Sequence, residues 1–265
     1  MKTIIVTAAD ETFAPLLLEL IQSLHQWEQI PCDAIGLLNL GLSETTLEKV
    51  RGRITDIVEP GWDLPIDPAL QRSKPFLRAM SARPFLREYF SGFDAYLWLD
   101  CDTWVQEKFA LEWFFKGSRD GFMALAPEID RSYVQSSTIL NWRKAALTGF
   151  YGEQATAFLA SHPYFNSGVF CLGRDALHWE SWAKFFRAGL EVLPKRVSDQ
   201  TALNYAIWKD DLPVYPLPAI CNWCCHLATP SVDPANGRFC EPHIPSRPIG
   251  IIHMAANTKD MRFTV

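Results

Sequence analysis

The residues of this sequence best suited to chemistry are two aspartates, Asp100 and Asp102, which follow a run of five apolar residues at 95–99 (AYLWL). The run predicts a buried strand, and in open α/β sheets ligands bind beyond the carboxyl ends of the strands. Two carboxylates one residue apart can converge on a hard divalent cation such as Mg²⁺ or Mn²⁺, which would neutralise a diphosphate. A turn in which an aspartate caps the next helix would explain the same pair, so the motif needs support from elsewhere.

Further polar residues follow at the ends of other predicted strands and helices. They are the segments Thr7-Ala8-Ala9-Asp10, Tyr164-Phe165-Asn166-Ser167-Gly168, Ser198-Asp199-Gln200 and Ile251-Ile252-His253, with Lys259 six residues later. The imidazole of His253 can add a nitrogen ligand to a metal, and Lys259 can meet a phosphate as a point charge. A helix cap at Asp199, a core histidine and a solvated lysine would explain these residues singly. Their joint occurrence in this order favours one shared site.

The elements that would position these residues alternate between strand and helix in the first half of the chain. Predicted strands cover residues 2–8, 34–40, 54–58, 95–99, 165–172, 214–217 and 249–254. Predicted helices cover residues 15–27, 43–50, 79–90, 175–190 and 199–208, and the hydroxyl of Ser43 would cap the second. Because alternating strands and helices form parallel βαβ units, we predict an α/β fold with a mainly parallel, Rossmann-like sheet and a mixed C-terminal part.

The ordered series AADETF, LWLDCDTWV, YFNSGVFCL, SDQTALN and IIHMAANTK resembles glycosyltransferase family 8, over about residues 3–259. The resemblance implies a single GT-A-like domain covering residues 1–265. Residues 1–105 would form the nucleotide-binding half and residues 106–265 the sugar and acceptor half. It further implies a retaining, Mn²⁺-dependent transferase that moves a hexose from a UDP-sugar to the hydroxyl of a saccharide or another acceptor, whose identity the sequence leaves open.

The resemblance also implies a role for each polar segment. Asp100, Asp102 and His253 would hold Mn²⁺ or Mg²⁺ against the donor diphosphate, which Lys259 would also bind. The uracil and ribose would contact Ala8 and Asp10, at the polar edge that begins with Thr7, and Arg83 would touch the donor. The residues lining the sugar subsite would be Asn166, Asp199 and Gln200.

The resemblance also bears on how the sugar is transferred with retention of configuration. Gln200 would stand nearest the face of the anomeric carbon opposite the UDP, and an amide is a poor nucleophile. We therefore favour attack on the face that UDP leaves, with a phosphate oxygen taking the acceptor proton, although double displacement stays open.

The family's His-x-x-Gly-x-x-Lys segment has Ala256 at its glycine position, and a methyl group is tolerable there only if φ is negative.

Two other classes of protein fit parts of the sequence. Asp100-Cys101-Asp102-Thr103 matches the DxDx[T/V] signature of haloacid-dehalogenase-type phosphatases, with Asp100 as nucleophile and Asp102 as acid/base. That class needs a second acidic pair at a strand end, for which Asp210-Asp211 is the only candidate. The other class is a protein that binds a nucleotide sugar without turning it over.

Cysteines and tryptophans suggest two further sites. Cys221-x2-Cys224 and Cys240-x2-His243 have the spacing of a structural Zn²⁺ site, with Cys225 and His226 as spare ligands, while buried thiols packed as small hydrophobes would explain the same residues. A sugar acceptor could stack on an aromatic ring, for which the candidates are Trp62, Trp142 and Trp223.

Composition excludes several classes of protein. Of the 265 residues 48% are hydrophobic and 21% charged, which is too apolar for a disordered chain, and the net charge of -5 argues against nucleic-acid or anionic-membrane partners. No run approaches the roughly 18 apolar residues that span a bilayer, and Asp10 and Glu11 interrupt the apolar start before it is long enough for a signal peptide. We predict a cytoplasmic protein with reduced thiols; its oligomeric state is left open.

Overall fold

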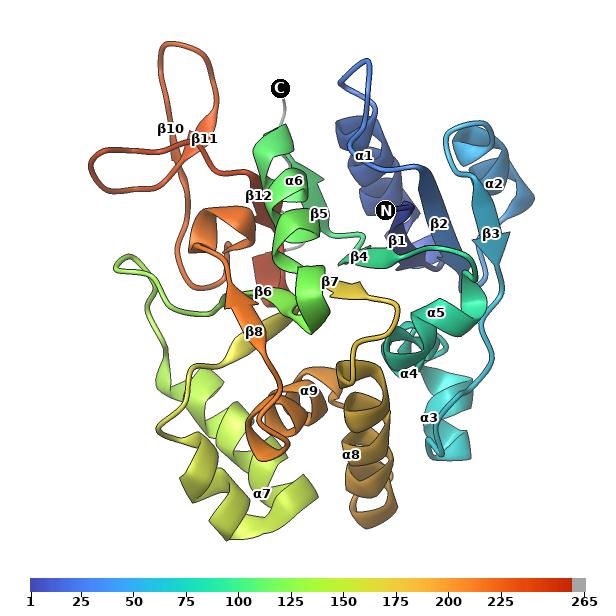
Figure 1. Ribbon diagram of the computed structural model, residues 1–265, viewed down its shortest axis with the longest axis vertical. Coiled ribbons are helices and arrows are strands. Elements are labelled where there is room, and N and C mark those ends of the chain that lie inside the picture. Colours follow the sequence, from blue (N-terminus) through green and yellow to red (C-terminus); the bar gives the residue numbers. More distant parts are fainter. Residues whose placement is uncertain (259–265) are drawn as a thin grey trace.

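A seven-stranded sheet in the order β3-β2-β1-β4-β7-β6-β8 organises residues 1–258, the part of the chain that this computed structural model describes (Figure 1). Its strands are β1 (Thr3–Ala9), β2 (Ala34–Asn39), β3 (Asp56–Val58), β4 (Ala95–Leu99), β6 (Met123–Pro127), β7 (Phe165–Gly173) and β8 (Val214–Pro216). The strands from β3 to β4 are parallel, whereas β7 runs antiparallel to both β4 and β6. The predicted mainly parallel sheet with a mixed C-terminal part is confirmed.

Two smaller sheets complete the β structure. One has the order β5-β12-β9, and the other is the hairpin of β10 and β11. Their strands are β5 (Thr103–Val105), β9 (Trp223–Cys224), β10 (Ser231–Val232), β11 (Phe239–Cys240) and β12 (Ile251–His253). Because β5 follows the Asp-Cys-Asp turn and pairs with β12, this small sheet joins the C-terminal strand to the end of β4.

Nine α-helices and five short 3₁₀ helices lie in residues 1–258. The α-helices are α1 (Ala14–Leu24), α2 (Glu44–Val50), α3 (Pro68–Ser73), α4 (Leu77–Ala82), α5 (Leu86–Tyr89), α6 (Lys108–Gly117), α7 (Ser137–Leu159), α8 (His178–Val192) and α9 (Asp199–Lys209). The 3₁₀ helices are η1 (Glu11–Phe13), η2 (Arg83–Phe85), η3 (Arg119–Gly121), η4 (Ala219–Cys221) and η5 (Ala256–Thr258). None of the helices described combines the length and apolar character needed to cross a bilayer.

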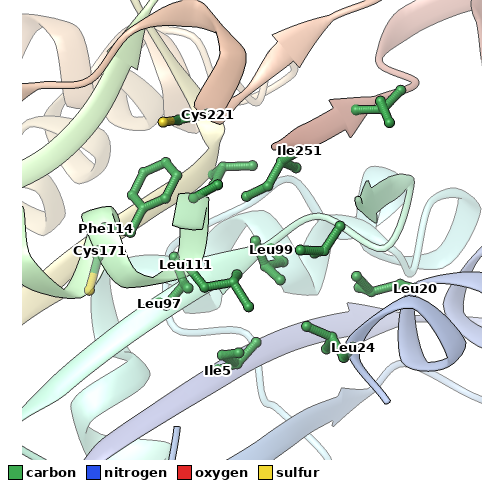
Figure 2. Close-up of a cluster of buried hydrophobic side chains, with 14 of the residues drawn as sticks. Ile5, Leu20, Leu24, Leu97, Leu99, Leu111, Phe114, Cys171, Cys221 and Ile251 are labelled. Carbon is green, nitrogen blue, oxygen red and sulfur yellow. The ribbon is translucent and has the colours of Figure 1, made fainter. Parts of the chain in front are cut away.

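Buried side chains pack on both faces of the large sheet. On one face α1 and α6 cover the strands, with Leu20, Leu111 and Phe114 in a cluster that Figure 2 shows. On the other face α5, α8 and α9 supply a second cluster that includes Trp179 and Trp182. In Figure 1 the first pair of helices lies above the sheet and α8 and α9 lie below it. These two layers hold the strand ends in place, and burial of this apolar surface is the main stabilising contribution to the fold.

The helix predicted over residues 79–90 is wrong as one continuous element. The chain forms α4, then η2, then α5, and Pro84 lies in the 3₁₀ turn between them. Proline has no N–H to donate and its ring crowds the preceding turn, so a regular α-helix cannot continue through it. The tighter turn places Arg83 beside the end of β4, where it contacts Asp100.

Candidate functional site

A cavity of about 310 Å³ lies where strand and helix ends meet at one edge of the large sheet. β1 and β4 end there, and β7 begins there because it is antiparallel to β4, with Val169 opposite Leu99. Most of the site residues predicted from the sequence line this cavity: Ala8, Asp10, Arg83, Asp100, Asp102, Asn166, Asp199, Gln200 and His253. Of the other two, Thr7 is fully buried in β1 and does not line the cavity, and Lys259 lies outside the described residues.

Three of these side chains form the candidate metal centre. One ligand atom from each of Asp100, Asp102 and His253 lies within 4.8 Å of the others. The Nε2 atom of His253 is 3.3 Å from Oδ1 of Asp102 and 3.7 Å from Oδ2 of Asp100. The register of the small sheet produces this arrangement, since His253 in β12 pairs with Thr103 in β5, one residue after Asp102. Two carboxylates and an imidazole are a donor set that suits Mn²⁺ or Mg²⁺.

Gly168 makes the room that this arrangement requires. A Cβ atom on Gly168 would lie 2.6 Å from Oδ2 of Asp100 and closer still to Cε1 of His253. Any side chain at position 168 would therefore push the imidazole and the carboxylate apart. The donor atoms and the space between them both fit a divalent cation.

Hydrogen bonds from two asparagines orient the imidazole. Asn166 Oδ1 accepts from the backbone N–H of Gly168 at 2.9 Å and from Nδ2 of Asn222 at 3.1 Å. The Oδ1 atom of Asn222 then lies 3.0 Å from Nδ1 of His253. Because an amide oxygen only accepts, Nδ1 must carry a proton, so Nε2 is the ring nitrogen that faces the two aspartates and could bind a metal. This is the tautomer that a metal-binding histidine needs.

Arg83 joins the carboxylates on the other side of the cavity. Its guanidinium pairs with Asp100, donates to Oδ2 of Asp199 at 2.5 Å and to Oγ of Ser167 at 3.2 Å, and lies 4.8 Å from the Trp98 ring. Burial alone would lower the pKa of Arg83, but the carboxylates of Asp100 and Asp199 raise it overall. The guanidinium thus reaches the cavity as part of an ion-pair network.

The pKa of Asp100 is raised above the usual value for an aspartate. Burial is the largest cause and the nearby charge of Asp102 adds to it, while Arg83 and His253 act in the opposite direction. Two carboxylates held close together in a partly dehydrated site repel each other, and a bound cation would relieve that repulsion. The electrostatics of the apo site therefore favour a cation.

The backbone at Ala256 contradicts the negative φ that the sequence reasoning required. Ala256 lines the cavity with φ of 57°, the left-handed conformation that glycine adopts freely. A residue with a Cβ in this conformation costs about 1 kcal/mol. The loop after β12 thus keeps the conformation of a glycine loop although the residue is alanine.

The four ligands proposed for a structural Zn²⁺ do not come together, so that prediction is wrong. Cys221 lies in the apolar core, as Figure 2 shows, and burial raises its pKa to about 12, which keeps the thiol protonated. The Sγ atom of Cys224 donates to the Asn222 carbonyl at 3.7 Å, and that of Cys240 to the Arg238 carbonyl at 3.7 Å. Among the described residues, the groups with metal-ligand spacing include no cysteine. These thiols pack as small hydrophobes.

The remaining candidates from the sequence differ in whether they line the cavity. Trp142 is half exposed and lines the cavity, whereas Trp223 is fully buried and donates to the Ala228 carbonyl at 2.8 Å, so it cannot bind an acceptor. Trp62 packs against the second apolar cluster. Asp210, offered for the phosphatase alternative, follows α9 as its C-cap and accepts from Ser181 at 2.7 Å, and it does not line the cavity of Asp100 and Asp102. The second strand-end acidic pair of that class is therefore not supplied by Asp210-Asp211.

Three residues at the site were missed by the sequence reasoning. Asn222 orients His253, and Glu128 and Arg143 form a buried ion pair beside Gln200. Glu128 carries a usable signal, because it follows an apolar run (MALAP) at a strand end just as Asp100 does. Asn222 and Arg143 carry no such signal, because asparagine in a loop and arginine on a helix are usually exposed, and nothing in the local sequence marks these two as exceptions.

Comparison with known proteins supports the fold. No protein-family model matches this sequence, and no curated protein matches it significantly. Among solved structures, the galactosyltransferase LgtC in complex with donor and acceptor sugar analogues is 20% identical, with a TM-score of 0.58 covering 96% of this chain and 87% of LgtC. Mouse xyloside xylosyltransferase 1 in its apo form is 14% identical, with a TM-score of 0.57 covering 97% of this chain and 98% of the other.

At these identities the likeness establishes the fold, which is that of the GT-A glycosyltransferases. The predicted GT-A-like α/β class is confirmed. Membership of glycosyltransferase family 8 stays a prediction.

Proposed function

We propose that this protein is a metal-dependent, retaining glycosyltransferase that moves a hexose from a UDP-sugar to an acceptor hydroxyl. The observation that carries the proposal is the convergence of Asp100, Asp102 and His253 on a cavity that Asp199 and Gln200 also line. A GT-A-like fold supports it, because nucleotide sugars bind at the carboxyl ends of the strands in such sheets. Residues 1–105 would hold the nucleotide and residues 106–265 the sugar and acceptor.

The donor would lie across the candidate metal centre. Asp100, Asp102 and His253 would hold Mn²⁺ or Mg²⁺, which when bound would neutralise the diphosphate and so stabilise UDP as a leaving group. Ala8 and Asp10 line the same cavity at the end of β1, where they would contact the uracil and ribose. Asp10 accepts from the backbone N–H of Phe13 at 3.2 Å, so it also caps η1 and is held still. Lys259 would bind the diphosphate, as the family resemblance implies.

Transfer would break the bond between the anomeric carbon and the phosphate oxygen and form one to the acceptor oxygen on the same face. The acceptor proton passes to the departing phosphate oxygen. In the transition state the sugar gains positive charge, which carbonyl oxygens and carboxylates lining the sugar subsite would stabilise. We assign this role to Asn166, Asp199 and Gln200, which line the cavity. The half-exposed ring of Trp142 would stack on a saccharide acceptor.

The test is a panel of nucleotide sugars incubated with the protein and Mn²⁺ and assayed for released UDP, since slow donor hydrolysis needs no acceptor. We expect release from one or a few UDP-sugars and loss of release when Mn²⁺ is chelated. Titration with UDP in the presence and absence of Mn²⁺ separates the alternatives. Tight UDP binding without release from any donor would show a binding protein, and the transferase proposal would then be withdrawn.

A further inference from the structure

Glu128 lies at the end of β6, with only 4% of its surface exposed, and binds two amides of the candidate site. Its Oε1 atom accepts from Nε2 of Gln200 at 3.0 Å and from Nδ2 of Asn166 at 3.1 Å. Its Oε2 atom pairs with the guanidinium of Arg143, which comes from α7 and packs 4.4 Å from the Tyr164 ring. The backbone N–H of Glu128 donates to the Tyr164 carbonyl at 2.8 Å, which ties β6 to the start of β7.

These contacts determine which way each amide faces. An ionised carboxylate can only accept hydrogen bonds, so Gln200 and Asn166 must turn their NH₂ groups toward Glu128. Asn166 is also held by the backbone N–H of Gly168, which donates to its Oδ1.

The Oε1 atom of Gln200 accepts from the N–H and Oγ of Ser167 and from Nδ2 of Asn166 at 3.4–3.5 Å, near the limit for a hydrogen bond. A hydrogen bond also links the Gln200 side chain to the Tyr164 phenol. The bond from Nε2 of Gln200 to Glu128, at 3.0 Å, is shorter than those to Oε1 and joins the amide to a charged group, so Glu128 has a strong influence on the orientation of this amide.

We propose that Glu128, held by Arg143, is a positioning residue that orients the amide of Gln200 so that its oxygen faces the sugar subsite. This inference rests on the proposed function, in which the sugar gains positive charge during transfer. An amide oxygen carries partial negative charge and stabilises that sugar, whereas the NH₂ group carries partial positive charge and destabilises it. A rotation of the amide by 180° changes the sign of the contribution without moving the backbone.

Glu128→Gln tests the orientation directly. The introduced amide has one oxygen, and the buried guanidinium of Arg143 claims it, because an unpaired buried charge costs more than a weakened neutral hydrogen bond. Its NH₂ group then faces the NH₂ of Gln200, which turns over. We expect kcat for UDP release to fall about 100-fold, the loss of one oriented dipole at a developing charge. UDP affinity in Mn²⁺ should stay within about twofold, since Gln200 contributes nothing to nucleotide binding.

A second variant separates positioning from a structural role. In Glu128→Gln/Arg143→Met no guanidinium competes for the introduced oxygen, which can again accept from Gln200. We expect the double variant to recover about tenfold in kcat over Glu128→Gln. A purely structural role predicts the opposite, because removing a second buried partner would damage the site further. A double variant no more active than the single one would overturn the proposal, as would Glu128→Gln retaining wild-type kcat.

Glu241 and Arg247 supply the matched control. Glu241 is fully buried and pairs with the half-exposed Arg247 through two hydrogen bonds of 2.8 and 2.6 Å, outside the cavity, so the two pairs share a buried carboxylate but not a buried guanidinium. Glu241→Gln and Glu241→Gln/Arg247→Met should each leave kcat within about twofold of wild type. Equal losses in the two pairs would show a general effect of neutralising a buried, arginine-paired carboxylate and would overturn the proposal.

A readout that does not depend on turnover keeps this proposal separate from the proposed function. The side-chain NH₂ of Gln200, assigned in NMR spectra by its loss in Gln200→Glu, should exchange slowly with solvent in the wild type. Exchange should be faster in Glu128→Gln and slow again in the double variant. If the wild type releases no UDP from any donor, the transferase proposal fails, while the exchange pattern still decides whether Glu128 orients Gln200. Unchanged exchange across the three proteins would contradict the orientation itself.

Discussion

Two clusters of carboxylates and an imidazole occur in the described part of this molecule, and they differ in what surrounds them. One is Asp100, Asp102 and His253, and the other is Asp130, Glu241 and His243. Each places three possible ligand atoms within 4.8 Å of one another. Composition and spacing alone would make both of them metal sites.

Arginines occupy the second cluster. Arg247 donates two hydrogen bonds to the carboxylate of Glu241, and Nε of Arg131 lies 3.0 Å from Nε2 of His243. These guanidinium groups bind Glu241 and Nε2 of His243, so a cation would have to compete with them for two of the three ligands, and their positive charge already offsets that of the carboxylates. This cluster ties the segment after β6 to the loop after β11, which is a structural role.

In the first cluster the cation Arg83 is kept to one side. It pairs with Oδ1 of Asp100, while Oδ2 faces the His253 imidazole across the space that Gly168 leaves open. The other imidazole nitrogen is committed to Asn222. A metal site therefore depends on which lone pairs the neighbouring residues leave available, and on room for the ion, more than on which ligands are present.

The largest expected effect follows from removing a carboxylate from the first cluster. Asp102→Asn should lower UDP release from the donor by about 1000-fold, because the site loses the charge that holds the cation and leaving group. The matched change in the second cluster, Asp130→Asn, should leave turnover within about twofold. The measurement is UDP release in Mn²⁺ buffer. A wild-type rate in Asp102→Asn would contradict the assignment of the first cluster, and not the second, as the metal site.

The space between the ligands is tested by Gly168→Ala. The added methyl group would displace His253 and Asp100, so we expect Mn²⁺ affinity, measured by titration calorimetry, to fall about 100-fold. Gly189→Ala is the control, because its Cβ would lie 2.7 Å from Phe150, far from the metal ligands. Both variants should lose about 1–3 kcal/mol of stability through overpacking. Only Gly168→Ala should lose Mn²⁺ affinity. An equal loss of affinity in both variants would contradict the proposal that the room left by Gly168 is needed for the ion.

Orientation of the imidazole is tested at Asn222. Asn222→Leu removes the acceptor for the proton on Nδ1 of His253, so both tautomers become accessible and Mn²⁺ affinity should fall about tenfold. Asn222→Asp keeps an acceptor at the same place and should retain more of the affinity than the leucine variant. Calorimetric titrations of both proteins provide the measurement. Equal affinities in the two variants would show that the hydrogen bond to Asn222 does not matter.

The smallest effect concerns stability without metal. Because the folded-state pKa of Asp100 is raised, its charge destabilises the folded apo protein at pH 7, and this cost disappears below the pKa of an unfolded aspartate. Asp100→Asn should therefore raise the unfolding free energy of the apo protein at pH 7. The gain should vanish near pH 3 in urea denaturation. Asp130→Asn should show no such gain, and a gain of equal size there would erase the contrast between the clusters.

Much of the fold could be predicted because its signals are local. β4 was predicted with its exact ends, β1 and β2 to within one residue at each end, and Ser43 caps α2 by accepting from the backbone N–H of Thr46. The prediction of one continuous helix over residues 79–90 was wrong for a local reason, because Pro84 lies in the middle of that range. The Zn²⁺ prediction failed for another reason, since cysteine spacing along the chain does not say which way each thiol points.

The ends of β1 and β4, and the aspartates beside them, follow from local sequence, because backbone geometry and side-chain alternation depend on near neighbours. Which groups meet follows from packing. His253 reaches Asp102 through the register of β12 on β5, and Glu128 reaches Gln200 across 72 residues. The direction of each amide and the tautomer of the imidazole follow from partners brought together by packing, and no local pattern encodes a partner that distant in the chain.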